Sequence, residues 1–458
     1  MLKMMFSFVG EQDPFSEKTG EEGSVVTLCR HLNPNVVYLF PTAAGYGVKS
    51  ETQTNADFTR EWILKEVGVD IGVFIKPLAL NDPTDYSSIL PRVRKEVGEV
   101  LTALAGQEVE IHLNCSSGTP QLKSTWIILA NAGLFRNCHL WQVSNPLYAD
   151  GKRVKEIEVT FLEEENIISR LNRYCREFLF QRMAEEAWRL QQISIYSYRR
   201  DKAALVQRIF LAYQSWDLIR YNDAYQRLNS VLSEIINTRD LRDLAALLER
   251  QVRVLKLLKA NTERETYENL IDLYFSARRR FIRGDYTDTL ARFWRIYEGT
   301  LYKQLREKYG IEPAELSRST DTNNLEIIKK YASNHPWELS PNIKKLGIHA
   351  SEIVLEKIFK DKTYSRLIET VFTARRGSSF QKLKLGTLLD ELRDRRNYSI
   401  VAHGMKPVSE EDAENSLAVL EEVFKVFFDG GELLMCYPFQ EEDLRLVISV
   451  LSQAFALL

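Results

Sequence analysis

The segment "LRDRRNYSIVAHGM", close to the end of the 458-residue sequence, contains an arginine and a histidine seven residues apart, Arg396 and His403. On a continuous α-helix this spacing is nearly two turns and would place both side chains on one face, about 10 Å apart. Histidine can transfer a proton near neutral pH, and arginine can hold a phosphate and stabilise its developing charge. The pair therefore predicts cleavage of a phosphodiester without a metal ion, and RNA offers its own 2′-hydroxyl as the nucleophile.

Asn397 adds a polar group beside Arg396, while Ile400 and Val401 are expected to pack inward. The alternative is that an arginine and a histidine at this spacing occur by chance on a solvated helix. The other five histidines have no recurring acidic or thiol partner in the sequence, so we expect them to be core or surface residues. They are His31, His112, His139, His335 and His349.

A second motif, "NCSSGTPQ" at residues 114–121, lies between an apolar run and a helical pattern. Thr119 is suited to be the N-cap residue of a helix, with Pro120 at its first position, and Gly118 would allow a tight turn. Backbone N–H groups at the start of a helix attract anions and polar ligands, and a bulky residue at Gly118 would then block the site. A plain, well-capped strand-to-helix turn is the other interpretation.

Up to about residue 165, short apolar runs alternate with segments of helical spacing. The runs are nearly continuous, which is typical of strands buried on both faces. They cover residues 2–9, 35–41, 70–80, 109–114 and 138–144. Helical segments between them lie at 23–32, 54–68 and 87–106. This order predicts an α/β, Rossmann-like domain with a parallel, doubly wound sheet, completed by an antiparallel edge strand over 156–164.

Ligands of open parallel sheets bind beyond the carboxyl ends of the strands. Three turns follow such ends, "VGEQDPF" (9–15), "PTAAGYG" (41–47) and "NCSSGTPQ", and we expect them to meet at one rim. The G-x-G-x-x-G sequence of dinucleotide enzymes does not follow the first strand, where only Gly10 occurs, and no P-loop is found. A dinucleotide-dependent enzyme is therefore disfavoured.

From about residue 166 to 430, long amphipathic segments predict a large all-α region. Two of its helices are expected to be joined at Gly284, and residues 431–440 to form a short strand or loop before a terminal helix. The arginine run at 278–283 is interpreted as a solvated helix face, with an RNA-facing stripe as the alternative. The acidic residues Glu163–Glu165 are interpreted as a charge cluster at the start of a helix.

The composition is ordinary for a soluble protein, with 45% hydrophobic and 27% charged residues. The formal net charge of −2 argues against a surface coated in positive charge for unspecific duplex binding. No segment is long and apolar enough to span a bilayer or to be a signal peptide. The five cysteines are scattered without a C-x-x-C pair, which disfavours a zinc site and a disulfide framework, so we expect a cytoplasmic protein.

The two motifs together resemble a known family. "RNYSIVAHG" resembles the R-x(4–6)-H signature of HEPN ribonucleases, and "SSGTPQ" with "VGEQDPF" resembles the ligand-sensing turns of CARF domains. The order CARF then HEPN, over nearly the whole chain, resembles the ancillary ribonucleases of type III CRISPR–Cas systems. The domains implied are a CARF ligand-sensing domain at 1–165, a helical linker region at 166–260 and a HEPN ribonuclease domain at 261–458.

This resemblance implies activation by a cyclic oligoadenylate, either cyclic tetra-adenylate or cyclic hexa-adenylate, and metal-independent cleavage of single-stranded RNA in antiviral defence. The catalytic residues would be Arg396, Asn397 and His403. The residues that bind the messenger would come from the three turns: Gly10, Gln12, Asp13, Thr42, Ser116, Ser117, Gly118, Thr119 and Gln121. No metal ligand and no further cofactor are expected.

A ring of four or six identical nucleotides has even symmetry, and a two-fold dimer presents the same surface twice, so a homodimer is expected. HEPN nucleases likewise usually build a composite site from two protomers. Messenger binding would shift the population of HEPN arrangements, a coupling of typically about 1–3 kcal/mol. Neither membrane association nor stable DNA binding is expected. The alternative function is a non-enzymatic cyclic-oligoadenylate sensor or scaffold.

Overall fold

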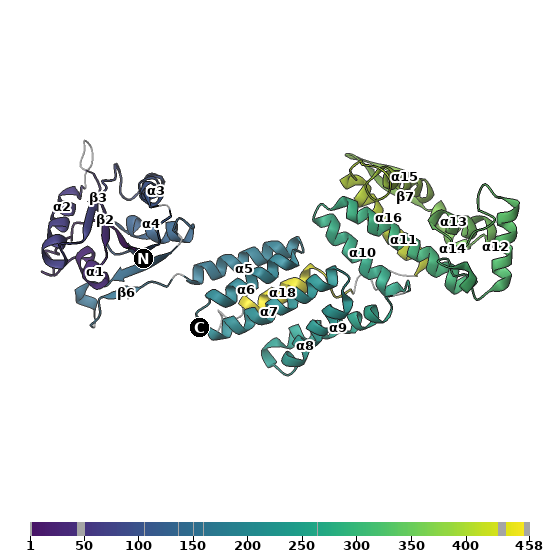
Figure 1. Ribbon diagram of the computed structural model, residues 1–458, viewed down its shortest axis with the longest axis horizontal. Coiled ribbons are helices and arrows are strands. Elements are labelled where there is room, and N and C mark those ends of the chain that lie inside the picture. The colour runs from purple at the N-terminus through teal and green to yellow at the C-terminus, as the bar shows by residue number, and fades with distance from the viewer. Residues whose placement is uncertain are drawn as a thin grey trace. The chain divides into compact units, whose positions relative to one another are not determined.

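The computed structural model describes residues 2–43, 51–104, 106–135, 137–149, 151–158, 160–262, 264–428 and 437–452. Contacts divide the chain into two compact units, Met1–Glu165 and Asn166–Leu458, each of which is described by itself (Figure 1). The first unit contains a sheet with helices on both faces. The second is mostly helical.

Six strands form one sheet in the first unit, in the order β3-β2-β1-β4-β5-β6. They are β1 Leu2–Phe8, β2 Val36–Phe40, β3 Gly72–Ile75, β4 Val109–Asn114, β5 Cys138–Val143 and β6 Val154–Glu156. The first five are parallel, whereas β6 is antiparallel to β5. At the centre of the sheet, Ser7 of β1 lies beside Leu39 of β2 and Asn114 of β4. The predicted parallel, doubly wound sheet is confirmed.

Helices cover both faces of this sheet. They are α1 Ser24–Leu32, α2 Gln53–Trp62 with a π-helical turn at Ile63–Val67, α3 Tyr86–Ala103 and α4 Pro120–Asn131. Val93 of α3 and Trp126 of α4 belong to the core on one face, and Val25 of α1 and Ala56 of α2 belong to the core on the other. Because helices bury both faces of the sheet, a ligand can reach only the loops that follow its strands.

The edge strand is shorter than predicted. β6 ends at Glu156, and α5 (Thr160–Arg176) takes up most of the segment 156–164 that was predicted to be a strand. The helix forms here because Ile168 and Leu171, one turn apart, are buried in the helical core. The prediction of a strand over the whole segment is therefore wrong, whereas its antiparallel edge position is confirmed.

The helices of the second unit enclose one large apolar core. After α5 they are α6 Phe180–Ile193, α7 Ser197–Asp217, α8 Tyr221–Ile235, α9 Arg242–Ala260, α10 Tyr267–Ile282, α11 Tyr286–Tyr309, α12 Thr322–Asn334, α13 Ile348–Ile353, α14 Lys362–Glu369, α15 Leu385–Tyr398, α16 Glu410–Phe427 and α18 Glu441–Ser452. The predicted junction at Gly284 is confirmed, and φ there is 78°. The predicted terminal helix is α18, which packs against α7 and α9 (Figure 1).

A β-hairpin interrupts these helices directly before α15, in a region expected to be all-α. Its strands are β7 (Val371–Arg376) and β8 (Ser379–Lys384). The side-chain amide of Asn415 on α16 forms two hydrogen bonds with the backbone of Arg375. It donates to the carbonyl at 3.1 Å and accepts from the N–H at 2.9 Å. The hairpin is thus attached to the helical core along β7. Residues 431–436 of the predicted strand or loop at 431–440 lie outside the described residues.

The arginine run at 278–283 is turned largely inward. Arg279, Arg280 and Arg283 contact the carboxylate of Asp217 on α7 at 2.8, 3.1 and 3.0 Å. The side chain of Arg279 is 2% exposed, and those of Arg280 and Arg283 are 14% exposed. Both interpretations of the run, a solvated face and an RNA-facing stripe, are therefore wrong for these three residues, which are part of the core.

A second buried carboxylate, that of Asp272 on α10, lies in the same region. It accepts hydrogen bonds from the indole of Trp216 at 2.7 Å and from the hydroxyls of Tyr221, at 2.8 Å, and Tyr437. Phe439 stacks on the ring of Trp216, with 4.6 Å between ring centres. The segment that leads into α18 thus helps to close the core around Asp272.

Two histidines of the first unit have acidic partners that the sequence spacing did not show. The rings of His112 on β4 and His139 on β5 stack with their centres 5.2 Å apart. His139 contacts Glu156 at 2.6 Å and Glu110 at 3.3 Å. The sequence showed no such partners, because only the pairing of neighbouring strands brings together residues that are distant in sequence.

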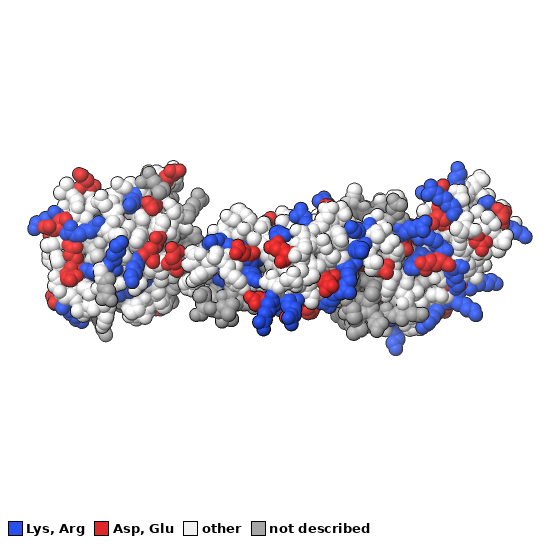
Figure 2. Space-filling view, turned by 90° about the horizontal axis from the view of Figure 1, so that it is seen from below, with Lys and Arg blue, Asp and Glu red and all other residues white. Residues whose placement is uncertain are grey.

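No helix within the described residues is long and apolar enough to cross a membrane. On the face drawn in Figure 2, acidic and basic side chains are interspersed over both units. This pattern agrees with the small net charge of the chain.

Candidate functional site

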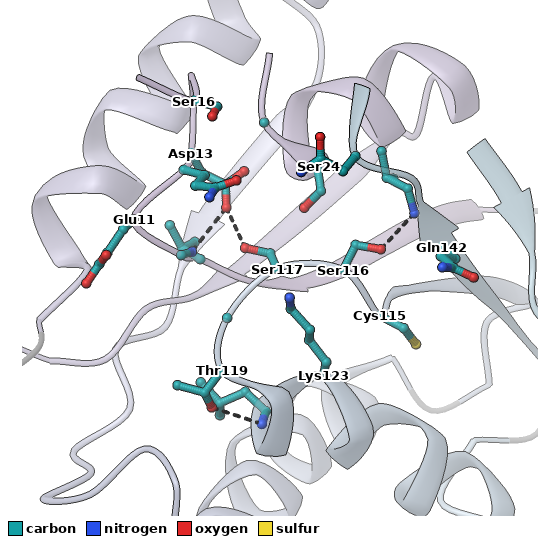
Figure 3. A pocket seen from close by; sticks show the side chains of 18 of the residues that line it. Glu11, Asp13, Ser16, Ser24, Cys115, Ser116, Ser117, Thr119, Lys123 and Gln142 are labelled. Atoms are coloured by element: carbon teal, nitrogen blue, oxygen red, sulfur yellow. Dashed lines mark hydrogen bonds between the residues drawn. The ribbon is translucent and has the colours of Figure 1, made fainter. Parts of the chain in front are cut away.

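A cavity of about 890 Å³ lies beyond the carboxyl ends of the strands in the first unit (Figure 3). Its walls come from the turns after β1, β2, β4 and β5 and from the starts of α1 and α4. The neighbouring strands β1 and β4 are followed by helices on opposite faces of the sheet, α1 and α4. Open parallel sheets bind their ligands at such a point.

Asp13 holds the turns around this cavity together. The residue is 3% exposed, and its carboxylate accepts hydrogen bonds from the N–H of Gly10 at 3.1 Å, the N–H of Val25 at 3.2 Å and the hydroxyl of Ser117. Burial raises the pKa of the Asp13 carboxyl, and these hydrogen bonds, that from Ser117 first, oppose the shift. Asp13 thus joins the turn after β1 to the turn after β4 and to the start of α1.

The hydroxyls of Ser116 and Thr119 are also engaged within the protein. Ser116 Oγ accepts a hydrogen bond from the N–H of Val143 at 2.7 Å. Thr119 Oγ1 caps α4 by accepting from the N–H of Leu122 at 3.2 Å, and it donates to the carbonyl of Pro83 at 2.7 Å. The predicted N-cap is confirmed. These hydroxyls fix the shape of the turn, so the donors offered to a ligand come from the backbone.

The backbone N–H groups of Ser117, Gly118 and Thr119 donate no hydrogen bond to any described residue. They lie at the positive end of the α4 dipole, where an anion is stabilised. Gly118 has a φ of 94°, and a Cβ there would lie 3.2 Å from Leu122 and 3.3 Å from Phe8. A bulky side chain at Gly118 would therefore press on the core instead of filling the cavity, contrary to the expectation from the sequence.

Lys123 supplies the cavity with a cation. It points from α4 toward the turn that carries Ser116 and Ser117 (Figure 3), and it forms no ion pair within the described part of the chain. Burial raises the pKa of the Cys115 thiol in the same wall to about 12, so this thiol is neutral at physiological pH. Backbone amides, a lysine and a neutral thiol are suited to bind a phosphate and do not provide a nucleophilic thiolate.

The second candidate site is the segment 392–405 of the helical unit. α15 ends at Tyr398, and the chain turns at Ser399, whose hydroxyl and N–H both donate to the carbonyl of Arg396, at 2.9 and 3.1 Å. Arg396 is therefore in the last turn of the helix, whereas His403 lies in the turn that follows. The predicted shared helix face is wrong, because the helix is not continuous over these residues.

Gly404 allows the chain to fold back after α15. A Cβ at this position would overlap the carbonyl group of Tyr398. The N–H of Gly404 donates to the carbonyl of Ser399 at 3.1 Å, and the N–H of Lys406 donates to that of Tyr398 at 2.9 Å. These contacts place His403 in a defined turn beside the end of the helix.

Arg396 differs from the arginines around it. Arg393 contacts Glu352 at 2.7 Å, and Arg395 contacts Asp412 at 3.5 Å. Arg396, which is half-buried, contacts no carboxylate within the described residues. A guanidinium group without a counter-charge is suited to hold a phosphate.

Asn397 and His403 are exposed, and so are three apolar side chains close to them in the sequence. Tyr398, Ile400 and Met405 are 58%, 70% and 90% exposed. The expectation that Ile400 packs inward is wrong, because the helix ends before it. A group of exposed apolar side chains is typical of a surface that another chain covers.

Both units of the chain are similar to known proteins. Residues 259–426 match the family model of the Csm6 HEPN domain. The CRISPR system endoribonuclease Csm6 of Enterococcus italicus is 22% identical over 312 residues, 67% of this chain and 68% of that protein. Csm6′ of Streptococcus thermophilus is 22% identical over 324 residues, 67% of this chain and 74% of that protein.

One solved structure, "Enterococcus italicus Csm6 bound to cyclic hexa-2'-fluoro-hexa-dAMP", is similar over 98% of this chain and 100% of its own, with a TM-score of 0.61 and 16% sequence identity. The fold is therefore shared over both units. The chain is thus similar to CARF–HEPN ancillary ribonucleases over both units. Its first unit has the CARF fold, and its second contains the HEPN domain.

Eight of the nine residues predicted to bind the messenger line the CARF cavity: Gly10, Gln12, Asp13, Thr42, Ser116, Ser117, Gly118 and Thr119. The ninth, Gln121, is not part of this lining, and its side-chain oxygen is buried in the protein. Part of the predicted turn at 41–47, residues 44–47, lies outside the described residues.

Sequence reasoning missed Lys123, Ser24, Gln142 and Arg153, which also line the CARF cavity. Lys123 was predictable from the sequence. It follows Thr119 by four residues on a helix whose start is predicted, and such residues share a face. Gln142 and Arg153 were not predictable, since only the order of the strands brings them to this rim. The HEPN residues Arg396, Asn397 and His403 lie in one segment, as their sequence positions require.

Proposed function

We propose that this protein is an endoribonuclease that a cyclic oligoadenylate switches on through the CARF cavity and that cleaves single-stranded RNA at the HEPN motif, in antiviral defence. The observation that carries the proposal is the guanidinium group of Arg396, which lacks a counter-charge among the described residues and is followed by an exposed histidine in a HEPN motif. Both protein names among the relatives contain the word endoribonuclease.

The messenger binds where the CARF cavity offers donors to its phosphates. These donors are the N–H groups of Ser117, Gly118 and Thr119 and the ammonium group of Lys123. Cyclic hexa-adenylate is our first candidate, since the solved relative is bound to a cyclic hexa-adenylate analogue. Cyclic tetra-adenylate is the second candidate, because a smaller ring presents the same phosphates and bases.

The reaction at the HEPN motif is an attack of the RNA 2′-oxygen on the adjacent phosphorus. A bond from phosphorus to O2′ forms and the bond to O5′ breaks, which leaves a 2′,3′-cyclic phosphate and a 5′-hydroxyl. The 2′-hydroxyl loses a proton and the leaving oxygen gains one, and His403 is the group that transfers protons. Arg396 holds the phosphate oxygens, and Asn397 donates a hydrogen bond beside it.

Two copies of the chain form the active state. Within the motif segment, Tyr398, Ile400 and Met405 are exposed, and a second HEPN domain would cover them while it brings its own Arg396 and His403 close. The even symmetry of a ring messenger supports the same two-fold arrangement at the CARF domains. We further propose residues 166–260 as a helical linker and 261–458 as the HEPN domain, in support of which the family model matches 259–426.

The decisive experiment incubates the purified protein with a fluorescent RNA and each cyclic oligoadenylate in EDTA. We expect cleavage that depends on the messenger, persists without divalent metal and yields 2′,3′-cyclic phosphate ends. An RNA with a 2′-deoxy group at the cleaved position should resist. Binding of the messenger without any cleavage would favour the alternative, a non-enzymatic sensor or scaffold. Loss of activity in EDTA would overturn the metal-independent mechanism.

A further inference from the structure

The last two turns of α15 carry Arg393 and Arg396, three residues apart and therefore on one side of the helix. Both guanidinium groups lie over the indole ring of Trp294 on α11, with their central carbons 5.9 and 5.8 Å from the ring centre. Trp294 is 3% exposed, and its Nε1 has no hydrogen-bond partner among the described residues. The ring is thus a buried platform against which both arginines lie.

Arg393 is fixed further by Glu352 of α13. Its Nη2 lies 2.7 Å from both carboxylate oxygens of Glu352, and the hydroxyl of Tyr297 on α11 donates to the same carboxylate at 2.9 Å. Glu352 is 6% exposed and Tyr297 is fully buried. Buried, fully used polar groups of this kind hold their elements in one arrangement, so α11 and α13 together fix α15.

Arg396 is held differently from Arg393. No carboxylate in the described ranges contacts it, and its Nε is buried without a hydrogen-bond partner. The place of its guanidinium group is therefore set by the helix that carries it and by the ring of Trp294. An aromatic ring can orient a guanidinium group without neutralising it, so the charge remains available to a phosphate.

We propose that Trp294 and Glu352 are positioning residues for the HEPN reaction. Glu352 fixes α15 through Arg393, and Trp294 orients the guanidinium group of Arg396 toward the scissile phosphate. The inference rests on the proposed ribonuclease function and extends it to two residues outside the HEPN motif. A group that stabilises developing charge must be held precisely, because a shift of about 1 Å can lower a rate by about 100-fold.

The test compares Glu352→Gln and Trp294→Phe with the parent protein, each alone and combined with Arg396→Ala. Single-turnover RNA cleavage is measured at saturating cyclic hexa-adenylate, together with the RNA concentration for half-saturation. Each change alone is expected to lower the maximal rate by about 10- to 100-fold at a temperature where the variant is folded, with half-saturation and messenger affinity nearly unchanged. In the Arg396→Ala background the same changes should alter the rate by less than about twofold, because the group they orient is absent.

Glu265→Gln is the matched control. Glu265 is a half-buried carboxylate that binds two arginines of α11, Arg295 at 2.6 Å and Arg306 at 2.9 Å, so its change perturbs a similar ion pair. It should leave the maximal rate within about twofold of the parent. Arg393→Lys is the second variant, to be used if Glu352→Gln does not fold. Lysine keeps the positive charge but loses the paired contact of the guanidinium group with Glu352. It should reproduce the expected rate loss.

Equal losses in the parent and Arg396→Ala backgrounds would overturn the inference, because they would reflect damage that does not act through Arg396. A loss with Glu265→Gln as large as that with Glu352→Gln would do the same, as would unchanged rates in Glu352→Gln and Trp294→Phe. Failure of the underlying function is a separate result: the unaltered protein would then cleave no RNA with any cyclic oligoadenylate.

Discussion

Asp13 and Lys123 both line the CARF cavity, and both can carry a charge. Only the charged group of Asp13 is bound by other residues of the described structure. The carboxylate of Asp13 accepts three hydrogen bonds from neighbouring turns, whereas Lys123 has no ion-pair partner in the described structure. The same division holds in the HEPN motif, where Arg393 is paired and Arg396 is not. We therefore expect Asp13 and Arg393 to shape their sites, and Lys123 and Arg396 to act in them.

Lys123→Ala tests the cavity at this scale. Because a hydrogen bond to a charged group contributes about 1.5–3 kcal/mol, the change should weaken messenger binding by about 10- to 100-fold in calorimetry. Lys95→Ala is the matched control, since Lys95 is an exposed lysine of the same unit on α3, outside the cavity lining. Equal affinities for Lys123→Ala and Lys95→Ala would remove Lys123 from the messenger site.

The chemistry of the HEPN motif is tested by His403→Ala and Arg396→Ala. Each should lower RNA cleavage on the order of 10²–10⁴-fold, the first through loss of proton transfer and the second through loss of charge stabilisation. Messenger affinity should stay the same in both variants, because the proposed messenger site is in the other unit. Full activity of the His403→Ala protein would return the helical unit to a scaffold role.

At the scale of elements, the helical unit depends on charges buried between helices. Burial by itself would raise the pKa of the Asp217 carboxyl, but Arg279, Arg283 and Arg280 together hold it below its ordinary value of 3.8. A carboxyl group whose pKa is lowered by folding stabilises the folded state above its ordinary pKa, and this contribution disappears as the pH falls through the lowered value. Two helices, α7 and α10, and the turn after α10 meet at this carboxylate.

Asp217→Asn should therefore destabilise the helical unit. The change leaves buried guanidinium groups without their shared counter-charge, which costs about 3–5 kcal/mol of unfolding free energy at neutral pH. Denaturant titrations of the variant and the parent should give a difference of this size at pH 7 and a shrinking difference below about pH 3.8. Asp390→Asn is the control, because the side chain of Asp390 is 73% exposed. A difference that does not change with pH would contradict this account.

The elements themselves were predictable to different degrees. The strands of the CARF sheet were found because burial on both faces makes each a continuous apolar run, and α4 was found because Thr119 and Pro120 mark its start. The end of α15 was not predicted. It depends on the hydrogen bond from Ser399 to the carbonyl of Arg396 and on the close approach of Gly404 to the backbone of Tyr398. These contacts form only once the chain has folded back.

The two candidate sites show the same limit. The residues of the CARF cavity were predicted well because parallel strands bring their carboxyl ends to one rim whatever the side chains are. The burial of Arg279 was not predicted, because its partner Asp217 lies 62 residues earlier on another helix. A pattern of charges along one helix indicates where side chains point, but it does not contain the partner that a neighbouring helix brings.

At the scale of the whole molecule, the proposed mechanism requires two chains. Light scattering of the purified protein should give about twice the chain mass of 53.1 kDa, with and without cyclic hexa-adenylate. Ile400→Asp and Met405→Asp together should lower RNA cleavage strongly, because they place charges in the surface expected to be covered. A strict monomer that still cleaves RNA would defeat the composite site.

The contact between α18 and the earlier helices has a consequence for biosynthesis. Arg396 and His403 leave the ribosome before Tyr437 and Phe439, which complete the core around Asp272. We expect a nascent chain that stops before these residues to hold the HEPN motif on an open, protease-sensitive core, as limited proteolysis of stalled chains would show. A cell that makes a nuclease directed at RNA would thereby be protected from unfinished copies of it, because a chain without Tyr437 and Phe439 could not complete this core.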